Sequence, residues 1–363
     1  MDKLVTVKNT KSGRVAARLD QEIHQGRYVP GTFLPSERQM AESYQVSVMT
    51  MRKCLDALCR KGRLVKLPQR GVMVPSRAAV RAEVAQIAYI TQALAGDSIP
   101  YIKGMNEAID HDRFSLATYV TQSNLDRYRR QIENVVRQHP AGVVLGTTFK
   151  EQHKVQGELL SQAGIPVVTL GQETVPHLAC DAVRDSARDG AARVARFIAG
   201  RGYRDLAFLT TSVVSSGETI STLREELSPN GVALPEDRIL LFEDPHGYAD
   251  LPNPCIDAED AMAGRLAKGF RCECLICGCD YMAVGALRAI LKAGISVPGR
   301  MKVISVLKDA SEGMTPLRVT TVDSHREYQG RLAVQVLTRR IDGLQGPVQV
   351  HYVSTDLVEG ETT

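Results

Sequence analysis

The chain has 363 residues, of which 44% are hydrophobic, and a formal net charge of +4; this length suits a small domain joined to a larger one, or two domains of middling size. No apolar run approaches the roughly 18 residues of a membrane-spanning helix, and the charged first segment, MDKLVTVKNTKSGR, lacks the apolar core of a secretory signal, so we expect a cytoplasmic protein without a membrane partner. Eight cysteines are too few for a disulfide scaffold in a chain of this length, and we expect reduced thiols.

The positive charge is concentrated at the N-terminal end. Residues 1–81 contain 16 Lys and Arg against 6 Asp and Glu, a net charge of +10, whereas the remaining residues carry −6. A basic segment on an acidic body favours a polyanionic partner for that segment alone, because neutralising phosphates releases counterions. On charge alone, a solvated basic surface remains the alternative.

Two helix starts follow each other closely in this basic segment. Ser36 and Gln39 fit a capping box, and Ser47 is a second N-cap after a break at residues 45–46. With an earlier helix expected at 14–25, this spacing predicts a helix-turn-helix on a three-helix core. The segment RLVKLPQRGVMVP that follows is typical of two short strands around a turn.

The second capped helix has two distinct faces. Met51, Leu55 and Leu58 share one face at about 100° per residue and are expected to pack in the core. The other side offers hydroxyl and cationic donors near the helix N-terminus, where the helix dipole also favours phosphate. That side carries Met49, Thr50, Arg52, Lys53 and Arg60.

The segment GRYVPGTFLPSERQMAESYQVSVMTMRKCLDALCRKGRLVKLPQRGVMV resembles the winged helix-turn-helix of the GntR family of bacterial repressors. Its P-G-x-x-L-P-S-E-R block, V-S-x-x-T-x-R block and Gly-closed wing occur in the family's order. One position departs, because Val48 stands where the family usually has Arg after the Val-Ser pair. The resemblance implies binding of a pseudo-palindromic operator in double-stranded DNA. By this resemblance, the residues that contact DNA would be Arg38, Ser47, Thr50, Arg52, Gln69, Arg70 and Gly71. Lys53 is expected to contact DNA as well, because it lies on the polar face of the second helix.

From Gln86 onward, apolar runs alternate with helix-like segments. IAYIT, GVVLGT, IPVVTLG, LAFLT, CLICG and KVISV are short and continuous, as in the buried strands of parallel sheets. They follow a polar connector, SRAAVRAEV. The sequence therefore predicts a winged helix at 1–75, a linker at 76–84 and a two-lobed α/β domain with parallel sheets at 85–363.

The order of pieces in the larger domain resembles the effector-binding domain of the LacI/GalR family, which shares the periplasmic-binding-protein-like fold. The most specific segments are CGCDYMAVGALRAILKAGISVPGR and PLRVTTVDSHREYQGRLAVQVLTRRIDG. The resemblance implies a homodimer formed through this domain. It also implies lobes of 85–184 with 325–342 and of 186–318 with 346–363, with crossings near Asp185, 321–324 and 343–347.

The same resemblance implies a small-molecule effector between the lobes, at the C-terminal ends of strands. Three positions depart from sugar-binding members, because Thr219, Cys279 and Leu307 stand where those usually offer Arg, Asn and Asp. Aromatic side chains on which a sugar ring could stack are also scarce, since the chain has no Trp. Either the effector is not a typical sugar or the response has been lost, so that a carbohydrate and another metabolite both remain open. The residues expected in this cleft are Thr147, Asp185, Thr219, Cys279, Asp280, Leu307 and Ser324.

Two rival functions are weighed against a ligand-modulated transcriptional repressor. Cys274 and Cys277 have zinc-like spacing, which would suit a metal- or redox-sensing regulator. In a strand, however, Cys272 and Cys274 would face one side and Cys277 and Cys279 the other, which favours small buried hydrophobes. A pyridoxal-phosphate body is less favoured, because no Schiff-base segment or other catalytic motif occurs. We therefore expect no enzyme activity, no cofactor and no metal.

Overall fold

The computed structural model describes residues 11–60, 63–67, 71–74, 84–92, 94, 98–121, 125–146, 150–171, 175, 178–211, 216–242, 254–308 and 313–363. The chain divides into two compact units, Met1–Val84 and Ala85–Thr363. Most of the predicted linker, 76–83, lies outside the described residues.

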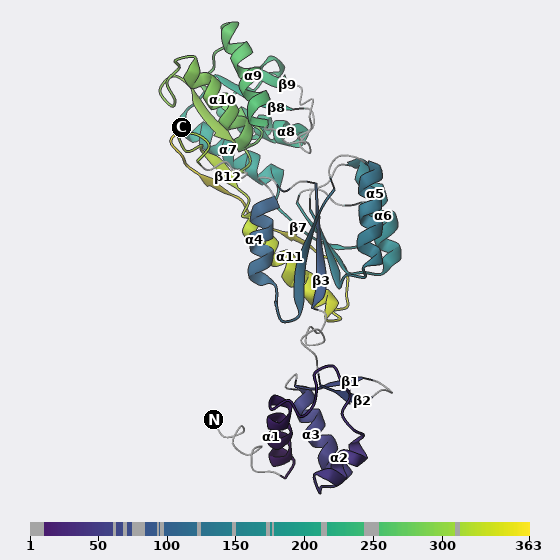
Figure 1. Ribbon diagram of the computed structural model, residues 1–363. Helices are drawn as coiled ribbons and strands as arrows, with labels where there is room; N and C mark the ends of the chain where they lie inside the picture. The colour runs from purple at the N-terminus through teal and green to yellow at the C-terminus, as the bar shows by residue number, and fades with distance from the viewer. Residues whose placement is uncertain are drawn as a thin grey trace. The chain divides into compact units, whose positions relative to one another are not determined.

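The first unit is a three-helix core with a small antiparallel sheet (Figure 1). It contains α1 (Lys11–His24), α2 (Glu37–Ser43), α3 (Val48–Arg60), β1 (Val65–Leu67) and β2 (Gly71–Met73). The predicted helix starts are confirmed. Gln39 N donates to Ser36 Oγ at 3.3 Å while Ser36 N donates to Gln39 Oε1 at 3.0 Å, and Thr50 N donates to Ser47 Oγ at 3.1 Å. Its core includes Leu19, Met40, Met51, Cys54, Leu55, Leu58, Leu64 and Val72.

The first lobe of the larger unit is a six-stranded parallel sheet in the order β13-β7-β6-β5-β3-β4. Helices α4 and α11 cover one face, and α5 and α6 cover the other (Figure 1). The strands are β3 (Ala85–Thr91), β4 (Phe114–Val120), β5 (Gly142–Leu145), β6 (Val167–Leu170), β7 (Asp181–Arg184) and β13 (Val350–Tyr352). The helices are α4 (Ser98–Ala108), α5 (Leu125–Arg137), α6 (Lys150–Ala163) and α11 (Arg326–Ile341).

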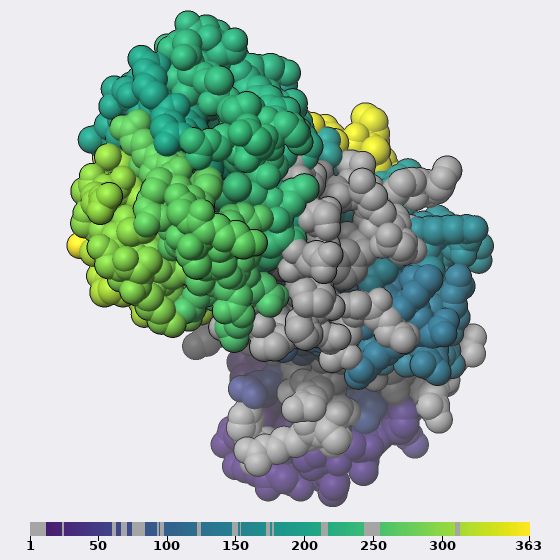
Figure 2. Space-filling view, turned by 90° about the horizontal axis from the view of Figure 1, so that it is seen from above, coloured from purple at the N-terminus to yellow at the C-terminus, as the bar shows by residue number. Residues whose placement is uncertain are grey.

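The second lobe is a four-stranded parallel sheet in the order β11-β10-β8-β9. Helices α7 and α8 pack on one face and α9 and α10 on the other, and the latter part of this lobe forms a continuous green surface in Figure 2. Its strands are β8 (Leu206–Thr211), β9 (Ile239–Phe242), β10 (Cys274–Cys277) and β11 (Lys302–Ser305). Its helices are α7 (Ala187–Arg201), α8 (Ser216–Leu227), η1 (Ser228–Asn230), η2 (Glu236–Arg238), α9 (Pro254–Ala267) and α10 (Asp280–Lys292). These sheets agree with the predicted fold class.

The chain passes between the lobes at three places. It leaves β7 for α7 at 185–186, leaves β12 (Thr321–Asp323) for α11 at 324–325, and leaves β13 for β14 (Asp356–Val358) at 353–355. Strands β12 and β14 pair antiparallel beside the second lobe, with Asp323 opposite Asp356.

The prediction that all of 346–363 belongs to the second lobe, with a crossing at 343–347, is wrong. Strand β13 pairs with β7 of the first lobe, with Val350 opposite Ala182 and Tyr352 opposite Arg184. Gly343 and Gly346 both have positive φ, so they turn the chain after α11 back to the same sheet. A Gly-rich turn marks a reversal of direction, and here it does not mark a change of lobe.

Two glycines allow α4 and α11 to pack with their backbones in close approach. A Cβ on Gly104 would lie 1.8 Å from Glu327 O, and one on Gly330 would lie 2.3 Å from Tyr101 O.

Gly330→Ala is expected to lower the free energy of unfolding by about 1–3 kcal/mol, because the helices must move apart. The control is Gly200→Ala in α7, where the new methyl meets no atom within 4 Å and the change should be neutral or stabilising by up to about 1 kcal/mol. Denaturant unfolding followed by circular dichroism checks both, and equal effects would contradict this account.

Candidate functional site

The candidate DNA-binding surface is the exposed side of α2 and α3. The hydroxyls of Ser47 and Thr50 lie 2.8 Å apart, so both predicted contacts also serve to cap the helix. Arg38 and Lys53 are exposed, as a phosphate contact requires. Arg38, Ser47 and Thr50 therefore lie at two neighbouring helix starts, and Lys53 follows within the second turn of α3.

Arg52 has an intramolecular partner that the sequence reasoning missed. Its Nε and Nη2 each lie 2.8 Å from Glu37 Oε2, while Lys66 Nζ lies 3.6 Å from Glu37 Oε1. The Arg52 side chain is still 53% exposed. The carboxylate thus holds the guanidinium in one orientation and leaves half of its surface open to a ligand. The available signal was Glu37 itself, which precedes Arg38 in the P-S-E-R block.

The predicted wing contacts are described only in part. Gln69 and Arg70 lie outside the described residues. Gly71 begins β2 with φ of 106°, a conformation that favours glycine. A Cβ at this position would lie 3.8 Å from the Phe33 ring, so backbone conformation rather than space explains the glycine.

In the second lobe, three of the predicted effector residues meet at the C-terminal ends of β10 and β11. Asp280 N donates to Leu307 O at 3.0 Å, and Ser305 Oγ donates to the same carbonyl at 2.8 Å. Cys279 is the N-cap residue of α10 and is buried together with Asp280. Leu307 contributes its backbone to this cluster, while its side chain packs against the hydrophobic core. Thr219 lies in α8 and is also buried.

In the first lobe, Asp185 is buried directly after β7, and Thr147 lies outside the described residues. The structure adds neutral polar side chains that the sequence reasoning missed. Gln156 Nε2 donates to Tyr128 Oη, and Thr121 Oγ1 donates to Thr91 O at the ends of β3 and β4. The buried members of this set are Thr91, Ser98, Thr121, Gln152 and Gln156. Their signal in the sequence was weak, because hydroxyls and amides are common at strand ends and on amphipathic helices.

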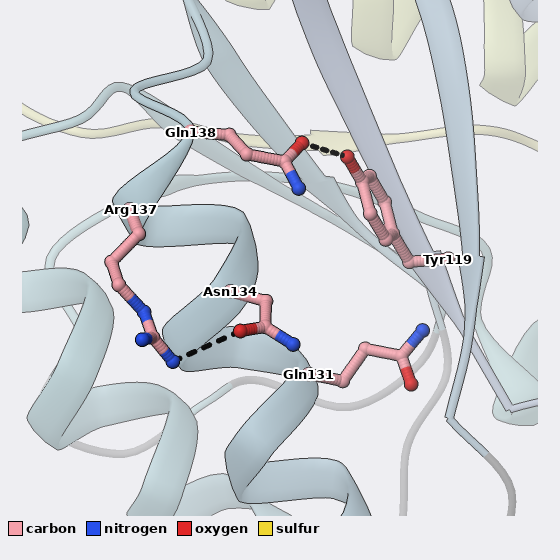
Figure 3. A pocket seen from close by; sticks show the side chains of 5 residues that line it. All are labelled: Tyr119, Gln131, Asn134, Arg137 and Gln138. Atoms are coloured by element: carbon pink, nitrogen blue, oxygen red, sulfur yellow. Dashed lines mark hydrogen bonds between the residues drawn. The ribbon is translucent and has the colours of Figure 1, made fainter.

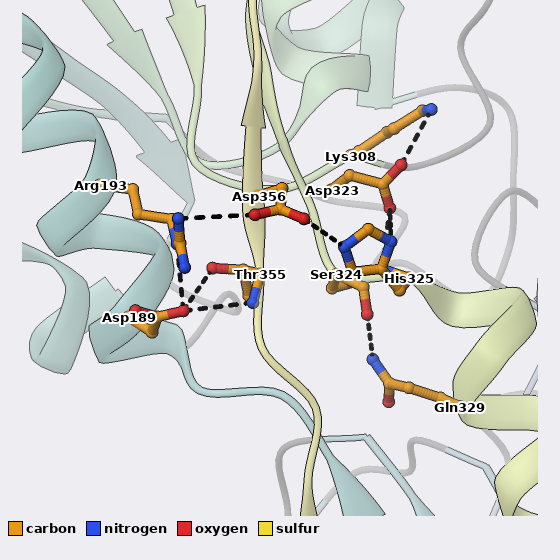
Figure 4. Close-up of polar contacts among 9 residues, drawn as sticks. All are labelled: Asp189, Arg193, Lys308, Asp323, Ser324, His325, Gln329, Thr355 and Asp356. Atoms are coloured by element: carbon orange, nitrogen blue, oxygen red, sulfur yellow. Dashed lines mark hydrogen bonds and ion pairs between the residues drawn. The ribbon is translucent and has the colours of Figure 1, made fainter.

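The crossing between β12 and α11 contains buried oxygens without a partner. Among the described residues, Thr321 Oγ1, Ser324 Oγ and Gln329 Oε1 are buried and accept or donate no hydrogen bond. Gln329 Nε2 does donate to Ser324 O at 2.7 Å, which ties the first turn of α11 to the crossing (Figure 4). Buried polar atoms normally have partners, so these three oxygens single out the crossing as a candidate ligand contact.

Charged side chains form ion pairs with the two aspartates of β12 and β14 at the same crossing (Figure 4). His325 Nε2 lies 2.9 Å from Asp356 Oδ2, and Lys308 Nζ lies 3.3 Å from Asp323 Oδ2. Burial acts to raise the pKa of Asp323, but the His325 backbone N–H and Lys308 more than offset it, so the net pKa is lowered. Two carboxylates opposite each other would repel, and these cationic and N–H partners stabilise them.

The cysteines near β10 are structural. Cys272, Cys277 and Cys279 pack in the core beneath α9 and α10, whereas Cys274 packs on the α7 and α8 side. The prediction that Cys272 and Cys274 share a face is wrong, because the strand begins only at Cys274. Burial raises the pKa of the Cys272 thiol to about 12 and that of Cys274 well above its usual value. Across the described ranges, no group of three or more His, Cys, Asp and Glu could hold a metal ion.

A surface pocket of about 450 Å³ lies beside the edge strand β4 and helix α5 (Figure 3). Tyr119 Oη donates to Gln138 Oε1 at 2.6 Å, and Arg137 Nη2 donates to Asn134 Oδ1 at 2.9 Å. None of the predicted effector residues lines it; its lining is Tyr119, Gln131, Asn134, Arg137 and Gln138.

In the part of the chain that the structure describes, every helix is too short or too polar to cross a bilayer.

Two segments of the chain match known families. Residues 11–74 match the bacterial regulatory proteins of the gntR family, and residues 195–363 match the periplasmic binding protein-like domain. The chain is 22% identical over 324 residues to the arabinose metabolism transcriptional repressor of Geobacillus stearothermophilus, with 87% of each chain covered.

Solved structures show the same fold. A transcriptional regulator CelR-cellobiose complex is 21% identical with a TM-score of 0.63, covering 88% of this chain and 92% of that one. A LacI family transcriptional regulator from Enterococcus faecium with bound ribose is 16% identical with a TM-score of 0.63, covering 77% and 98%.

These likenesses confirm the predicted winged helix-turn-helix and the predicted two-lobed effector fold. The relatives are transcriptional repressors rather than enzymes, in agreement with the expectation from the sequence. The chain is therefore a transcriptional regulator that binds DNA through a GntR-type winged helix-turn-helix and carries a periplasmic-binding-protein-like effector domain.

Proposed function

We propose that the protein is a cytoplasmic repressor that binds a pseudo-palindromic operator as a homodimer, and that a small molecule between the two lobes modulates this binding. The basic, capped α2–α3 surface supports the DNA contact, with Arg38, Arg52 and Lys53 exposed. A two-fold dimer matches the symmetry of such an operator. Dimerisation is assigned to residues 85–363.

The observation that carries the effector proposal is the set of three buried oxygens at the β12–α11 crossing. Thr321 Oγ1, Ser324 Oγ and Gln329 Oε1 lie where the chain passes from one lobe to the other, and no described residue bonds to them. An unpaired buried polar group costs about 1–3 kcal/mol. A ligand that supplies hydrogen bonds there would remove this cost and would touch the segment that joins the lobes.

The chemistry around this crossing favours a neutral, hydrogen-bonding effector. Within the described ranges, the unpartnered groups at the crossing are hydroxyl and amide oxygens, which suit the hydrogen-bonding groups of a polyhydroxy compound. The related regulators named above were solved with cellobiose and with ribose. We therefore place a carbohydrate, or another neutral polar metabolite, in a cleft lined by Asp185, Thr219, Cys279, Asp280, Leu307 and Ser324.

Thermal-shift screening of neutral sugars and other polar metabolites tests this proposal. A ligand present at 100 times its dissociation constant should stabilise the protein by about 2.7 kcal/mol. Ser324→Ala should weaken that ligand about two- to tenfold, the effect of one neutral hydrogen bond, and should leave the unliganded protein at least as stable as before, because it removes a buried Oγ that has no partner among the described residues. The matched control is Ser221→Ala, which removes an exposed hydroxyl from α8. A ligand that binds both variants equally well would place its site elsewhere.

A further inference from the structure

Two apolar side chains are exposed at the start of α3. Val48 is 40% exposed and Met49 is 62% exposed. Four other apolar residues along the helix, Met51, Cys54, Leu55 and Leu58, are almost completely buried. The amphipathic pattern of α3 is therefore broken only in its first turn, and the two residues contribute little to the core.

The surroundings of this apolar pair are cationic. Val48 is four residues before Arg52, and Met49 is four residues before Lys53, so each lies on the same helix face as an exposed positive charge. The capped first turn of α3 presents backbone N–H groups beside them, with Ser47 as the N-cap. A docked polyanion would thus hold Val48 and Met49 against its surface.

The chemistry of the DNA major groove leaves one partner for such side chains. Each base edge offers hydrogen-bond donors or acceptors, but only thymine also presents an apolar group, its C5 methyl. Valine and methionine side chains cannot donate a hydrogen bond to a base edge. In helix-turn-helix proteins, the N-terminal residues of the recognition helix contact base edges.

We propose that Val48 and Met49 determine operator sequence by contacting thymine 5-methyl groups in the major groove. This inference rests on the proposed DNA-binding function, with α3 as the recognition helix. Cationic neighbours anchor the phosphates and carry no sequence information directly, whereas Val48 and Met49 select the base. The operator half-site should therefore contain thymine at the positions facing the first turn of α3.

The experiment begins with selection of operator DNA from a random duplex library by the full chain. In the selected half-site, each thymine is replaced in turn by deoxyuridine, which removes only the methyl group. Affinity should fall about fourfold at each contacted thymine, the effect of losing one buried methyl-sized group. Thymines in the flanking DNA should show no effect.

A variant with Val48→Ser and Met49→Gln links the effect to these residues. Its affinity for the thymine and deoxyuridine operators should become equal, since each side chain that would contact a methyl is now polar. The matched control is Val29→Ser, which changes another exposed valine outside α3 (61% exposed) and should preserve the fourfold discrimination.

The outcomes separate the two proposals. Selection that enriches no sequence overturns the DNA-binding function and this inference together. Enrichment of an operator whose affinity does not depend on thymine methyls, or a double variant that discriminates as well as the wild type, overturns the inference alone.

Discussion

Replacing Arg38 and Arg52 together by alanine is expected to weaken binding to the selected operator by at least about 30-fold. Each arginine that contacts DNA contributes about 1–3 kcal/mol, and the two side chains come from different helices. Both are exposed on the α2–α3 surface. Fluorescence anisotropy with labelled operator measures the loss, and repeating it between 50 and 200 mM salt should give a shallower salt dependence if phosphate contacts are removed.

A matched control variant distinguishes the effect of where the arginines lie from the effect of net charge. Arg14→Ala with Arg27→Ala removes two positive charges from the same unit, but at α1 and the segment after it. This variant should bind operator nearly as well as the wild type. The Glu37–Arg52 pair is half-exposed, so its loss should cost the fold at most about 1 kcal/mol, and circular dichroism checks that the unit remains folded. Equal losses from both double variants would show that only net charge matters.

Asp181→Asn is expected to lower the free energy of unfolding of the larger unit by about 3 kcal/mol, because it breaks a buried ion pair. Asp181 is only 3% exposed. Its carboxylate accepts hydrogen bonds from Arg340 Nε at 2.7 Å, Arg340 Nη2 at 3.0 Å and Gln349 N at 2.7 Å. This residue therefore ties β7 to α11 and to the segment that leads into β13.

The pH dependence of the same variant gives a second readout. Burial acts to raise the pKa of Asp181, but the bonds from Arg340 and Gln349 more than offset it, so the folded-state pKa is lowered. A lowered pKa contributes stability above the unfolded value of about 3.9, and this stability is lost as pH falls through the folded-state pKa. The difference between wild type and Asp181→Asn should therefore be full at pH 6 and should shrink below about pH 4.

The control for this prediction is Asp342→Asn, which breaks the exposed pair with Arg113. Its unfolding midpoint in denaturant should move much less than that of Asp181→Asn. If both variants unfold at the wild-type midpoint, the Asp181 network does not hold the first lobe together.

Features encoded by neighbouring residues could be predicted from the sequence. The starts of α2 and α3 depend on Ser36, Gln39 and Ser47, whose capping bonds span three residues. The buried parallel strands were visible as continuous apolar runs, since both of their faces are covered by helices. Local signals of this kind do not depend on how distant segments pair.

Features that depend on distant pairing could not be predicted. Val350 pairs with Ala182 across 168 positions of sequence, and the turn before it gave no sign of which sheet the strand would join. The sequence does not distinguish Gln329 from an ordinary helix residue. Its burial and its hydrogen bond to Ser324 O depend on the packing of the crossing. The hydrogen bond from Arg52 to Glu37 could not be predicted either, because it depends on how α2 and α3 pack against each other.

The affinity of the full chain for its selected operator, measured with and without the ligand found by thermal-shift screening, tests the central claim most directly. A ligand that bridges the lobes changes the balance of their arrangements by its differential affinity. Coupling of about 1–3 kcal/mol between the two sites predicts a change in operator affinity of about 5- to 150-fold. The Ser324→Ala variant should need more ligand for the same change. A ligand that saturates the protein and leaves operator affinity unaltered would contradict an effector-controlled regulator.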